Sequence, residues 1–279
     1  MQSLFRLSAR WPLGLLHALG ALLGWMVYLG SPTYRRRFNE NIRQAGLPPA
    51  QARGAIAGAG RLVTEMPWVW LRPHHEKAPL IHWNGAEHVD AALARGKGVI
   101  FMTPHIGCFE CVPQAQVERY GGRHGAMTLL YRPSKVAWFD AILREVRSAP
   151  GLEPAPTTTG GVRMVLKALK QGRVVGLLPD QVPAAGLGVW APFFGRPAYT
   201  MTLALRLAQQ TGAALLMTWG DRLPGGQGYV VSVEPLALPL DQPHEAAAAA
   251  LNAAMEQLIR KRPGMYLWGY ARYKEPRED

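Results

Sequence analysis

The N-terminal part of the chain carries a long apolar stretch without charged side chains. Between Trp11 and Tyr34 there is no Asp, Glu, Lys or Arg, and the apolar part reads WPLGLLHALGALLGWMVYLG. About 20 such residues can cross a bilayer core or lie deeply in one leaflet. A signal peptide usually has a shorter apolar region, and no small-x-small cleavage site follows Met26. We therefore expect a retained membrane-anchoring helix, with a buried core helix and a cleaved signal as alternatives.

The pattern changes after this stretch. Residues 35–46 and 49–71 read as helices, and from Leu80 onward short apolar runs alternate with segments of helical period. We expect strands at 80–84, 98–103, 126–130, 173–178, 213–219 and 228–234, and helices at 86–95, 109–119, 135–148, 161–171, 200–211 and 243–261. This alternation predicts an α/β fold, with a mixed or largely parallel central sheet flanked by helices.

The helix expected at 161–171 shows most clearly which side is buried. Its apolar residues follow the i, i+3, i+4, i+7 rule, and its cations mark the opposite face. The apolar residues are Val162, Val165, Leu166 and Leu169, and the cations are Arg163, Lys167 and Lys170. One side of this helix should pack on the sheet while the other presents positive charge to solvent.

The chain has no internal repeat and no Ser-rich or Gly-rich linker. Its 279 residues, 48% of them hydrophobic, are enough for a substantial core. The simplest division is a membrane anchor at 1–33 and one catalytic domain at 34–279, in which 34–75 form a helical lead-in. The basic cluster just after the anchor suits an anionic cytoplasmic leaflet, so the domain is expected in the cytoplasm. This cluster consists of Arg35, Arg36, Arg37 and Arg43.

The overall charge of the chain favours anionic partners. A formal net charge of +12 favours nucleic acid, phospholipid head groups or an acidic carrier protein. No nucleic-acid-binding motif accompanies the charge, so we expect no nucleic-acid partner. A non-enzymatic basic membrane or nucleic-acid protein is the alternative of another class, and an intact catalytic pair would argue against it.

The strongest chemical signal is a histidine at the end of an apolar run. Val99-Ile-Phe-Met-Thr-Pro leads to His105, with Gly107 in the following turn and Glu110 five residues on. Ligands of open α/β sheets bind just beyond strand ends. On one continuous helix, residues five apart point about 140° from each other. If His105 stays in the loop and Glu110 starts a helix, the carboxylate can orient the imidazole as a general base. A turn histidine beside a surface Glu is the alternative.

The only two cysteines, Cys108 and Cys111, form a C-x-x-C motif. Such a pair at a helix start is typical of a thioredoxin-like redox centre, and with His105 and His124 it has enough ligands for zinc. The zinc hypothesis leaves Glu110 as a bystander, and the redox motif normally sits in a small thioredoxin fold. A serine hydrolase is disfavoured because the chain contains no G-x-S-x-G.

Several motifs taken together resemble a known family. These are H-x4-E at 105–110, Tyr131-Arg132-Pro133, Leu178-Pro179-Asp180-Gln181, Pro192-Phe193-Phe194-Gly195 with Thr200, and Tyr266-Leu267-Trp268 with Arg272 and Lys274. In this order they resemble the lipid A secondary acyltransferases, within the wider glycerolipid acyltransferase superfamily. The resemblance covers most of the chain, including the apolar N-terminal stretch.

The resemblance implies direct transfer of a fatty acyl group from a thioester, normally on acyl carrier protein, to a hydroxyl of an anionic lipid A precursor at the inner membrane. It implies no acyl-enzyme intermediate, and we expect neither a cofactor nor a metal. His105 and Glu110 would be catalytic. The substrate-binding candidates are Gly107, Tyr131, Arg132, Pro133, Asp180, Gln181 and Val182. Arg132 would bind a phosphate or the developing oxyanion through its planar fork, and Asp180-Gln181 would line the acceptor pocket.

Some positions depart from the family pattern. Ile106 and Cys108-Phe109 stand where the family often has an aromatic and Asn-Trp, residues 134–136 lack its Asn, and Tyr270-Ala271-Arg272 replaces a His-Arg-Arg-like string. These departures leave the reaction type unchanged but leave the acceptor open. A lysophospholipid or another hydroxyl-bearing lipid is the alternative acceptor.

Overall fold

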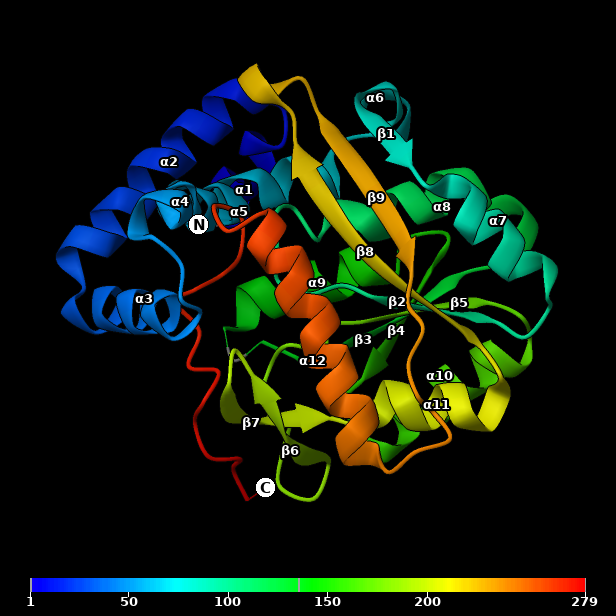
Figure 1. Cartoon of the computed structure of the whole chain (residues 1–279). Coiled ribbons are helices and arrows are strands. Elements are labelled where there is room, and N and C mark those ends of the chain that lie inside the picture. The colour runs from blue at the N-terminus through cyan, green and yellow to red at the C-terminus, as the bar shows by residue number, and fades with distance from the viewer. Residues whose placement is uncertain (1, 135, 279) are drawn as a thin grey trace.

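A seven-stranded sheet forms the centre of the molecule (Figure 1). The structure is a computed structural model and describes residues 2–134 and 136–278. The strand order is β1-β9-β8-β2-β5-β3-β4. The strands are β1 (Ile81–Asn84), β2 (Val99–Met102), β3 (Met127–Tyr131), β4 (Leu152–Pro156), β5 (Val174–Leu177), β8 (Ala214–Arg222) and β9 (Tyr229–Pro235). Neighbouring strands are parallel except for β8 and β9, which are antiparallel. The expected mixed, largely parallel sheet is confirmed.

Both faces of the sheet are covered, as parallel strands require. In β2, Ile100 and Met102 belong to one hydrophobic core, and Val99 and Phe101 belong to the other. All four side chains are fully buried. The first core includes residues of α10 (Thr159–Lys170), α11 (Leu203–Thr211) and α12 (His244–Lys261). The second includes residues of α7 (Ala86–Ala94), α8 (Cys111–His124) and α9 (Ala137–Arg147).

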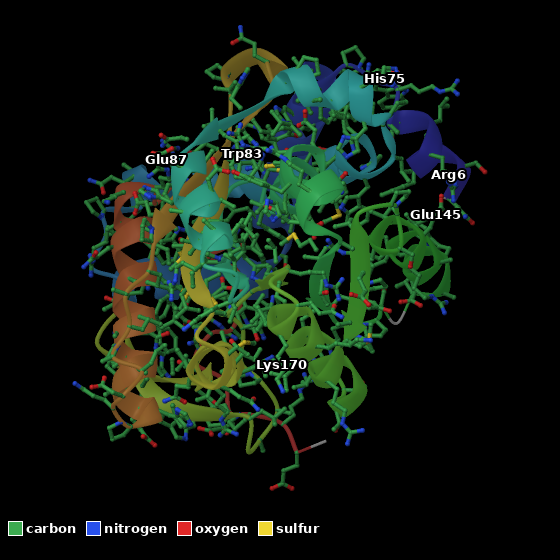
Figure 2. The ribbon with its side chains drawn as sticks, turned by 90° about the vertical axis from the view of Figure 1, so that its right-hand side faces the viewer. Arg6, His75, Trp83, Glu87, Glu145 and Lys170 are labelled. Carbon is green, nitrogen blue, oxygen red and sulfur yellow. The ribbon has the colours of Figure 1, made fainter. Side chains whose placement is uncertain are left out.

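The helical period predicted for α10 is confirmed. Val165 and Leu169 are buried, and Arg163, Lys167 and Lys170 are exposed. Because β4 and β5 are both parallel to β2, α10 starts at the carboxyl edge of the sheet and ends at the opposite edge. Lys170, the last residue of α10, therefore lies at the edge opposite the carboxyl ends of β2 and β5; it is labelled in Figure 2.

The N-terminal helices pack beside this α/β domain. They are α1 (Gln2–Ser8), α2 (Leu13–Gly30), α3 (Pro32–Gln44), α4 (Pro49–Ala52) and α5 (Gly54–Leu71). Helix α2 is, among the described residues, the one helix long and apolar enough to cross a membrane, and 28% of it is buried. It lies against α5 through glycines: a Cβ on Gly60 would sit 2.0 Å from the Gly20 carbonyl oxygen, and one on Gly24 would sit 2.1 Å from that of Ile56. Close backbone approach therefore fixes α2 to the domain.

Helix α1 packs on the domain through Phe5, whose ring lies 6.0 to 6.3 Å from those of Trp70, Trp138 and Phe139, and it also makes an ion pair. Arg6 pairs with Glu145 of α9, and both side chains are about half exposed (Figure 2). An exposed ion pair of this kind is usually worth less than about 1 kcal/mol.

Some elements were not expected from the sequence. These are β4, the short helices α1 and α6 (His74–Lys77), and a hairpin of β6 (Gly188–Phe193) and β7 (Arg196–Met201). The hairpin turns through Phe194 and Gly195, which both have positive φ, as a two-residue primed turn requires. The expected helix at 135–148 is found as α9, and its first expected position, residue 135, lies outside the described residues.

Candidate active site

His105 lies at the carboxyl edge of the sheet, just beyond the central strand β2. The backbone N–H of Thr103 still bonds to Leu177 of β5, and Pro104 then leads the chain away from the sheet. The loop is held on its far side as well, because Gly107 N–H donates to Met265 and Cys108 N–H donates to Gly220. A sheet edge of this type is where α/β enzymes place their chemistry.

The imidazole of His105 faces a buried carboxylate, that of Asp180. Nδ1 of His105 lies 2.7 Å from Oδ1 of Asp180, and the backbone N–H of His105 donates to Oδ2 at 2.9 Å. Asp180 follows β5, which pairs with β2 in parallel, so the two strand ends bring the groups together. A carboxylate on Nδ1 fixes the tautomer with its proton there and leaves Nε2 free to accept a proton.

The second ring nitrogen faces the side chain of Gln181. Nε2 of His105 lies 3.1 Å from the side-chain amide nitrogen of Gln181. The Phe109 ring packs edge-on against the imidazole, with ring centroids 4.8 Å apart. The His105 side chain is 15% exposed whereas that of Asp180 is 3% exposed. The imidazole is therefore partly exposed, while the carboxylate behind the ring stays shielded from water, and with the proton on Nδ1 the Gln181 amide donates to Nε2.

Electrostatics keep Asp180 ionised. Burial by itself raises the pKa of this carboxyl. The charge of His105 and the two hydrogen bonds from His105 lower the pKa by more, so that it lies below its ordinary value. Arg272 adds a smaller lowering contribution. Arg272 is itself buried and donates to the Tyr199 carbonyl and the Thr200 hydroxyl. The pair is thus a buried anion behind an imidazole.

The expectation that Glu110 contacts His105 is wrong. Glu110 accepts a hydrogen bond from the Trp70 indole at 2.9 Å, and both of its oxygens bond to Arg147 of α9 at 2.6 and 2.8 Å. Among the described residues, the side chain of His105 bonds to Asp180 and Gln181 instead. Glu110 is the N-cap residue of α8, as expected, but there its carboxylate turns away into the contact between α5, α8 and α9.

The other predicted site residues lie around the same edge. Tyr131 is the last residue of β3, and Arg132 and Pro133 follow it in exposed positions. Val182 donates its backbone N–H to the Tyr270 hydroxyl at 3.0 Å. Gly107 has a φ of 60°, and a Cβ there would lie 2.1 Å from the Gly220 carbonyl oxygen. Gly107 therefore allows the backbone to approach that of Gly220 closely. Tyr131, Arg132 and Pro133 remain candidates for substrate binding.

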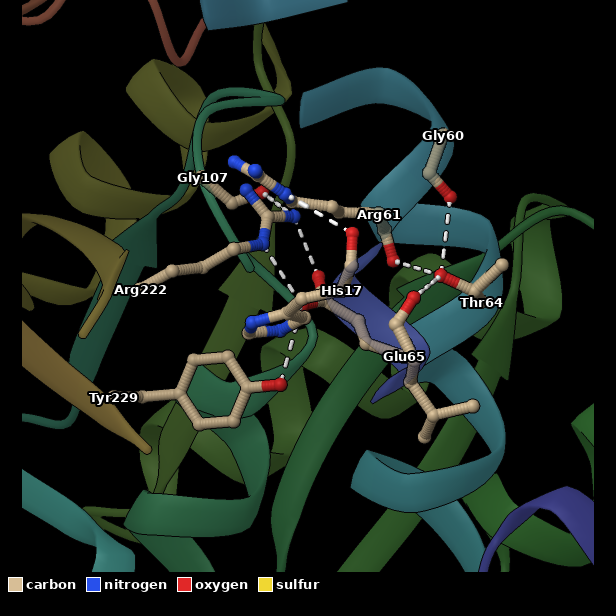
Figure 3. A network of polar contacts seen from close by, with 9 residues as sticks. His17, Gly60, Arg61, Thr64, Glu65, Gly107, Arg222 and Tyr229 are labelled. Carbon is tan, nitrogen blue, oxygen red and sulfur yellow. Dashed lines mark hydrogen bonds and ion pairs between the residues drawn. The ribbon is translucent and has the colours of Figure 1, made fainter. Parts of the chain in front are cut away.

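The loop that carries His105 is braced from below by a buried polar network (Figure 3). Arg222 of β8 donates to the Gly107 carbonyl at 3.1 Å and pairs with Glu65 of α5 at 2.8 Å. Glu65 also lies 3.0 Å from Nε2 of His17, in α2, and accepts from the Tyr229 hydroxyl. His17, a residue of the apolar N-terminal helix, is thus linked through Glu65 and Arg222, by three contacts, to the loop that carries His105.

The cysteine motif does not support a redox or zinc site. Cys108 and Cys111 are fully buried, and burial raises the pKa of the Cys108 thiol, opposite to what a reactive thiolate needs. Within the part of the chain that the structure describes, no group of three His, Cys, Asp or Glu side chains could hold a metal ion. The two thiols pack instead beneath the catalytic loop, where Gly220 leaves room for Cys111.

Several contributors to the site were not assigned a place from the sequence. Arg147 and Trp70 hold Glu110, and Arg222 and Glu65 hold the loop. Arg147 and Glu65 lie in segments that read as ordinary helices, and Arg222 lies between two expected strands, so no local signal marked them. Arg272 belonged to a C-terminal motif, but its place behind Asp180 depends on the fold.

The fold and the geometry together place a histidine, backed by a buried aspartate, at the carboxyl edge of an α/β sheet, the usual position of an active site in such proteins. The sequence profile of the bacterial lipid A biosynthesis acyltransferase family matches residues 8–275. The chain belongs to this family and is an acyltransferase.

Individual relatives agree on the chemistry. The lipid A biosynthesis lauroyltransferase of Escherichia coli K12 is 29% identical over 223 residues, which cover 78% of this chain and 69% of that protein. The palmitoleoyltransferase of the same organism is 25% identical over 218 residues, covering 78% and 68%. A phosphatidylinositol mannoside acyltransferase of Mycobacterium tuberculosis H37Rv is 32% identical over 157 residues, covering 54% and 46%.

Proposed function

We propose that this enzyme transfers a fatty acyl group from the thioester of acyl carrier protein to a hydroxyl of a lipid A precursor, at the cytoplasmic face of the inner membrane. The observation that carries the proposal is the contact of His105 Nδ1 with buried Asp180, which leaves Nε2, beside the Gln181 amide, as the basic nitrogen of a partly exposed imidazole. The names of the E. coli relatives support lipid A as the acceptor.

The proposed reaction is a single direct displacement. As the acceptor oxygen attacks the thioester carbonyl, its proton passes to Nε2 of His105, and Asp180 stabilises the resulting imidazolium. The carbon–sulfur bond then breaks, and the departing sulfur takes the proton to leave as a thiol. Gln181 and exposed Arg132 are the proposed donors to the developing oxyanion or to an anionic group of the substrate.

The test is a transfer assay with purified full-length enzyme, acyl carrier protein thioester and a lipid A precursor, followed by mass spectrometry of the product. The wild-type enzyme should add one acyl group in ester linkage. His105→Ala should lose transfer by a factor of roughly 10² to 10⁴, the usual contribution of general base catalysis. Near-normal transfer by His105→Ala would disprove the mechanism.

A second acceptor class has its own support. The mycobacterial relative carries a phosphatidylinositol mannoside acyltransferase name at 32% identity, so a glycolipid other than lipid A, or a lysophospholipid, is the alternative. Mass spectrometry of total lipids from cells with and without the gene distinguishes the two. Loss of one acyl group from lipid A supports the first proposal, and an unchanged lipid A with a change in another lipid supports the second.

A further inference from the structure

A wide groove runs between α3 and the C-terminal segment at 271–274. Its volume is about 560 Å³. Its lining includes Arg36, Arg37, Glu40, Arg43, Arg196 and Lys274. The walls are fixed to each other, because the Asn41 side chain of α3 donates to the carbonyls of Trp268 and Tyr270. The groove is therefore a built feature of the fold.

The groove is strongly positive. It holds five exposed or half-buried cations, namely Arg36, Arg37, Arg43, Arg196 and Lys274, against one carboxylate, that of Glu40. Arg36 and Glu40 lie 3.9 Å apart, and their side chains are 69% and 58% exposed, so the pair neutralises little. Among the described residues, the other four cations have no carboxylate within ion-pair distance. Such a concentration of unpaired cations in a concave site favours a multiply charged anion.

Two of the cations are held in place by aromatic rings. The Arg196 guanidinium lies 4.7 Å from the centre of the Tyr273 ring, and Lys274 Nζ lies 5.0 Å from that of Tyr270. Arg36, Arg37 and Arg43 come from the exposed face of α3. Buried Phe38 and Ile42 anchor the opposite face of this helix. Positioned guanidinium groups match the geometry of phosphate oxygens.

The groove adjoins the candidate active site through one wall. Tyr270, beneath Lys274, accepts a hydrogen bond from the Val182 N–H, and the neighbouring Gln181 contacts His105. The groove also adjoins the apolar helix, because α3 begins directly after α2 at Ser31. An acceptor lipid with its chains along α2 would thus present its head group both to the groove and to His105.

We propose that this groove binds a phosphate group of the lipid acceptor and so selects phosphorylated lipids as substrates. The inference rests on the proposed function, because it assumes a lipid acceptor. An acidic protein such as the acyl donor is the other kind of anion. The concave shape and the position beside the apolar helix favour the lipid phosphate.

The test compares a groove variant with a charge-matched control. In R36Q/R37Q/R196Q three groove cations become neutral. In R95Q/K97Q/R123Q three exposed cations are lost at the opposite edge of the sheet, before β2 and β3. Each is assayed as the full chain in detergent micelles, with the lipid A precursor and with the same precursor after phosphatase treatment.

We expect the groove variant to raise KM for the phosphorylated acceptor about tenfold or more, with little change in kcat and no change in KM for the dephosphorylated acceptor. The control variant should leave both acceptor KM values unchanged. Inorganic pyrophosphate should compete with the phosphorylated acceptor in the wild-type enzyme and not in the groove variant. Equal losses on both acceptors, a matching effect of the control, or a rise in KM for the acyl carrier protein alone would overturn the proposal.

A binding arm separates this proposal from the transfer mechanism. H105A and the fourfold variant H105A/R36Q/R37Q/R196Q are titrated with the phosphorylated acceptor in micelles, and binding is measured by calorimetry. H105A should bind as the wild type does, and the groove changes should weaken binding about tenfold. If H105A keeps transferring acyl groups, the proposed mechanism is wrong. The binding comparison still tests whether the groove binds the acceptor phosphate. Equal binding by H105A and the fourfold variant would refute the groove proposal alone.

Discussion

The chemistry of His105 depends on which carboxylate faces its Nδ1 atom. Asp180 holds that position at 2.7 Å and remains ionised because its pKa is lowered. In Asp180→Asn the neutral amide no longer stabilises the imidazolium that forms in the transition state. We expect kcat to fall by roughly 10² or more, with KM and the circular dichroism spectrum nearly unchanged. A variant that keeps most of its kcat would show that Asp180 only supports the loop.

Glu110 should behave as a structural residue instead. Its carboxylate is buried and pairs with Arg147, so Glu110→Ala leaves a buried cation without its partner. Breaking such a pair costs about 3–5 kcal/mol of unfolding free energy. Denaturant unfolding of E110A, compared with the double variant E110A/R147M, tests this. The double variant should recover much of the lost stability, and an unchanged stability of E110A together with a lost kcat would point to a direct catalytic role.

The sequence could locate the histidine but not its partner. Val99 to Pro104 predicts a buried strand with His105 at its end, and the structure confirms this. Glu110 was expected at the start of the next helix and Asp180 in the acceptor pocket, and the spacing within H-x4-E allowed Glu110 to contact His105. The choice depends on the parallel register of β2 and β5, which brings residues 75 positions apart together. Register between distant strands is a tertiary property that the local pattern does not contain.

Helices α2 and α5 and strands β8 and β9 are joined through Glu65. Burial raises the pKa of this carboxyl, but Arg222 and His17 lower it more, to about 2 from an ordinary value of 4.5. The difference corresponds to roughly 3 kcal/mol of stability at neutral pH. Because the folded pKa is depressed, this contribution is complete above pH 4.5 and is lost as the pH falls towards about 2.

The measurement is urea unfolding of the wild type and Glu65→Gln at several pH values between 6 and 2.5. We expect the wild type to be several kcal/mol more stable near pH 6, because the variant leaves Arg222 buried without its anion. The difference should shrink as the pH falls below about 4.5. A difference that stays constant with pH would show that the Glu65 charge does not stabilise the fold.

One face of α2 is free for lipid, while the other packs on α5. Leu22, Met26 and Leu29 are 58%, 54% and 63% exposed, an unusual concentration of apolar surface. We expect L22Q/M26Q/L29Q to move the protein from the membrane fraction to the soluble fraction after a high-salt wash, whereas the wild type stays. The control V136Q/L187Q/W190Q changes exposed apolar residues of the catalytic domain and should not release the protein. Release of the wild type by salt alone would assign binding to Arg35, Arg36 and Arg37.

This packing also bears on the predicted division at residue 33. A truncation that begins near Ser31 removes His17 from Glu65 and Gly20 from Gly60, so it should weaken the fold as well as membrane binding. The division into anchor and domain stays a prediction, and surface substitutions on α2 test the anchor more cleanly than deletion does.

Regular elements were predicted where their period was clear, and missed where local chemistry was unusual. The strand β4 reads Leu-Glu-Pro-Ala-Pro, and two prolines argue against a strand. It forms because it is an edge strand, paired only with β3 among the described residues, where a missing N–H is tolerated. The β6–β7 hairpin was not predicted because its turn, Phe194-Gly195, lacks the Asn-Gly or Asp-Gly signal of such hairpins, and Phe194 is buried there.

At the scale of the whole molecule, the cations behind the net charge of +12 include two separate groups. One group of cations lines the groove beside α3, and another lies along α10. Because α10 runs from the carboxyl edge of the sheet to the opposite edge, its first turn is the part nearer His105. A helix of 12 residues is about 18 Å long, so Arg163 and Lys170 differ in their distance from the chemistry.

We predict that acyl carrier protein docks on the cationic face of α10, formed by Arg163, Lys167 and Lys170. Charge reversal should weaken encounter and raise KM for the carrier with little effect on kcat, because exposed charges mainly guide association. Arg163→Glu should raise this KM more than Lys170→Glu does. Raising the salt concentration should also raise the KM of the wild-type enzyme for the carrier, since the Debye length is already only about 8 Å at 0.15 M. The double variant R95E/K97E at the opposite edge should have no effect. The decisive comparison uses acyl coenzyme A, which presents the same thioester without an acidic protein surface. Equal kcat/KM for both donors, unaltered by charge reversal on α10, would refute the carrier assignment.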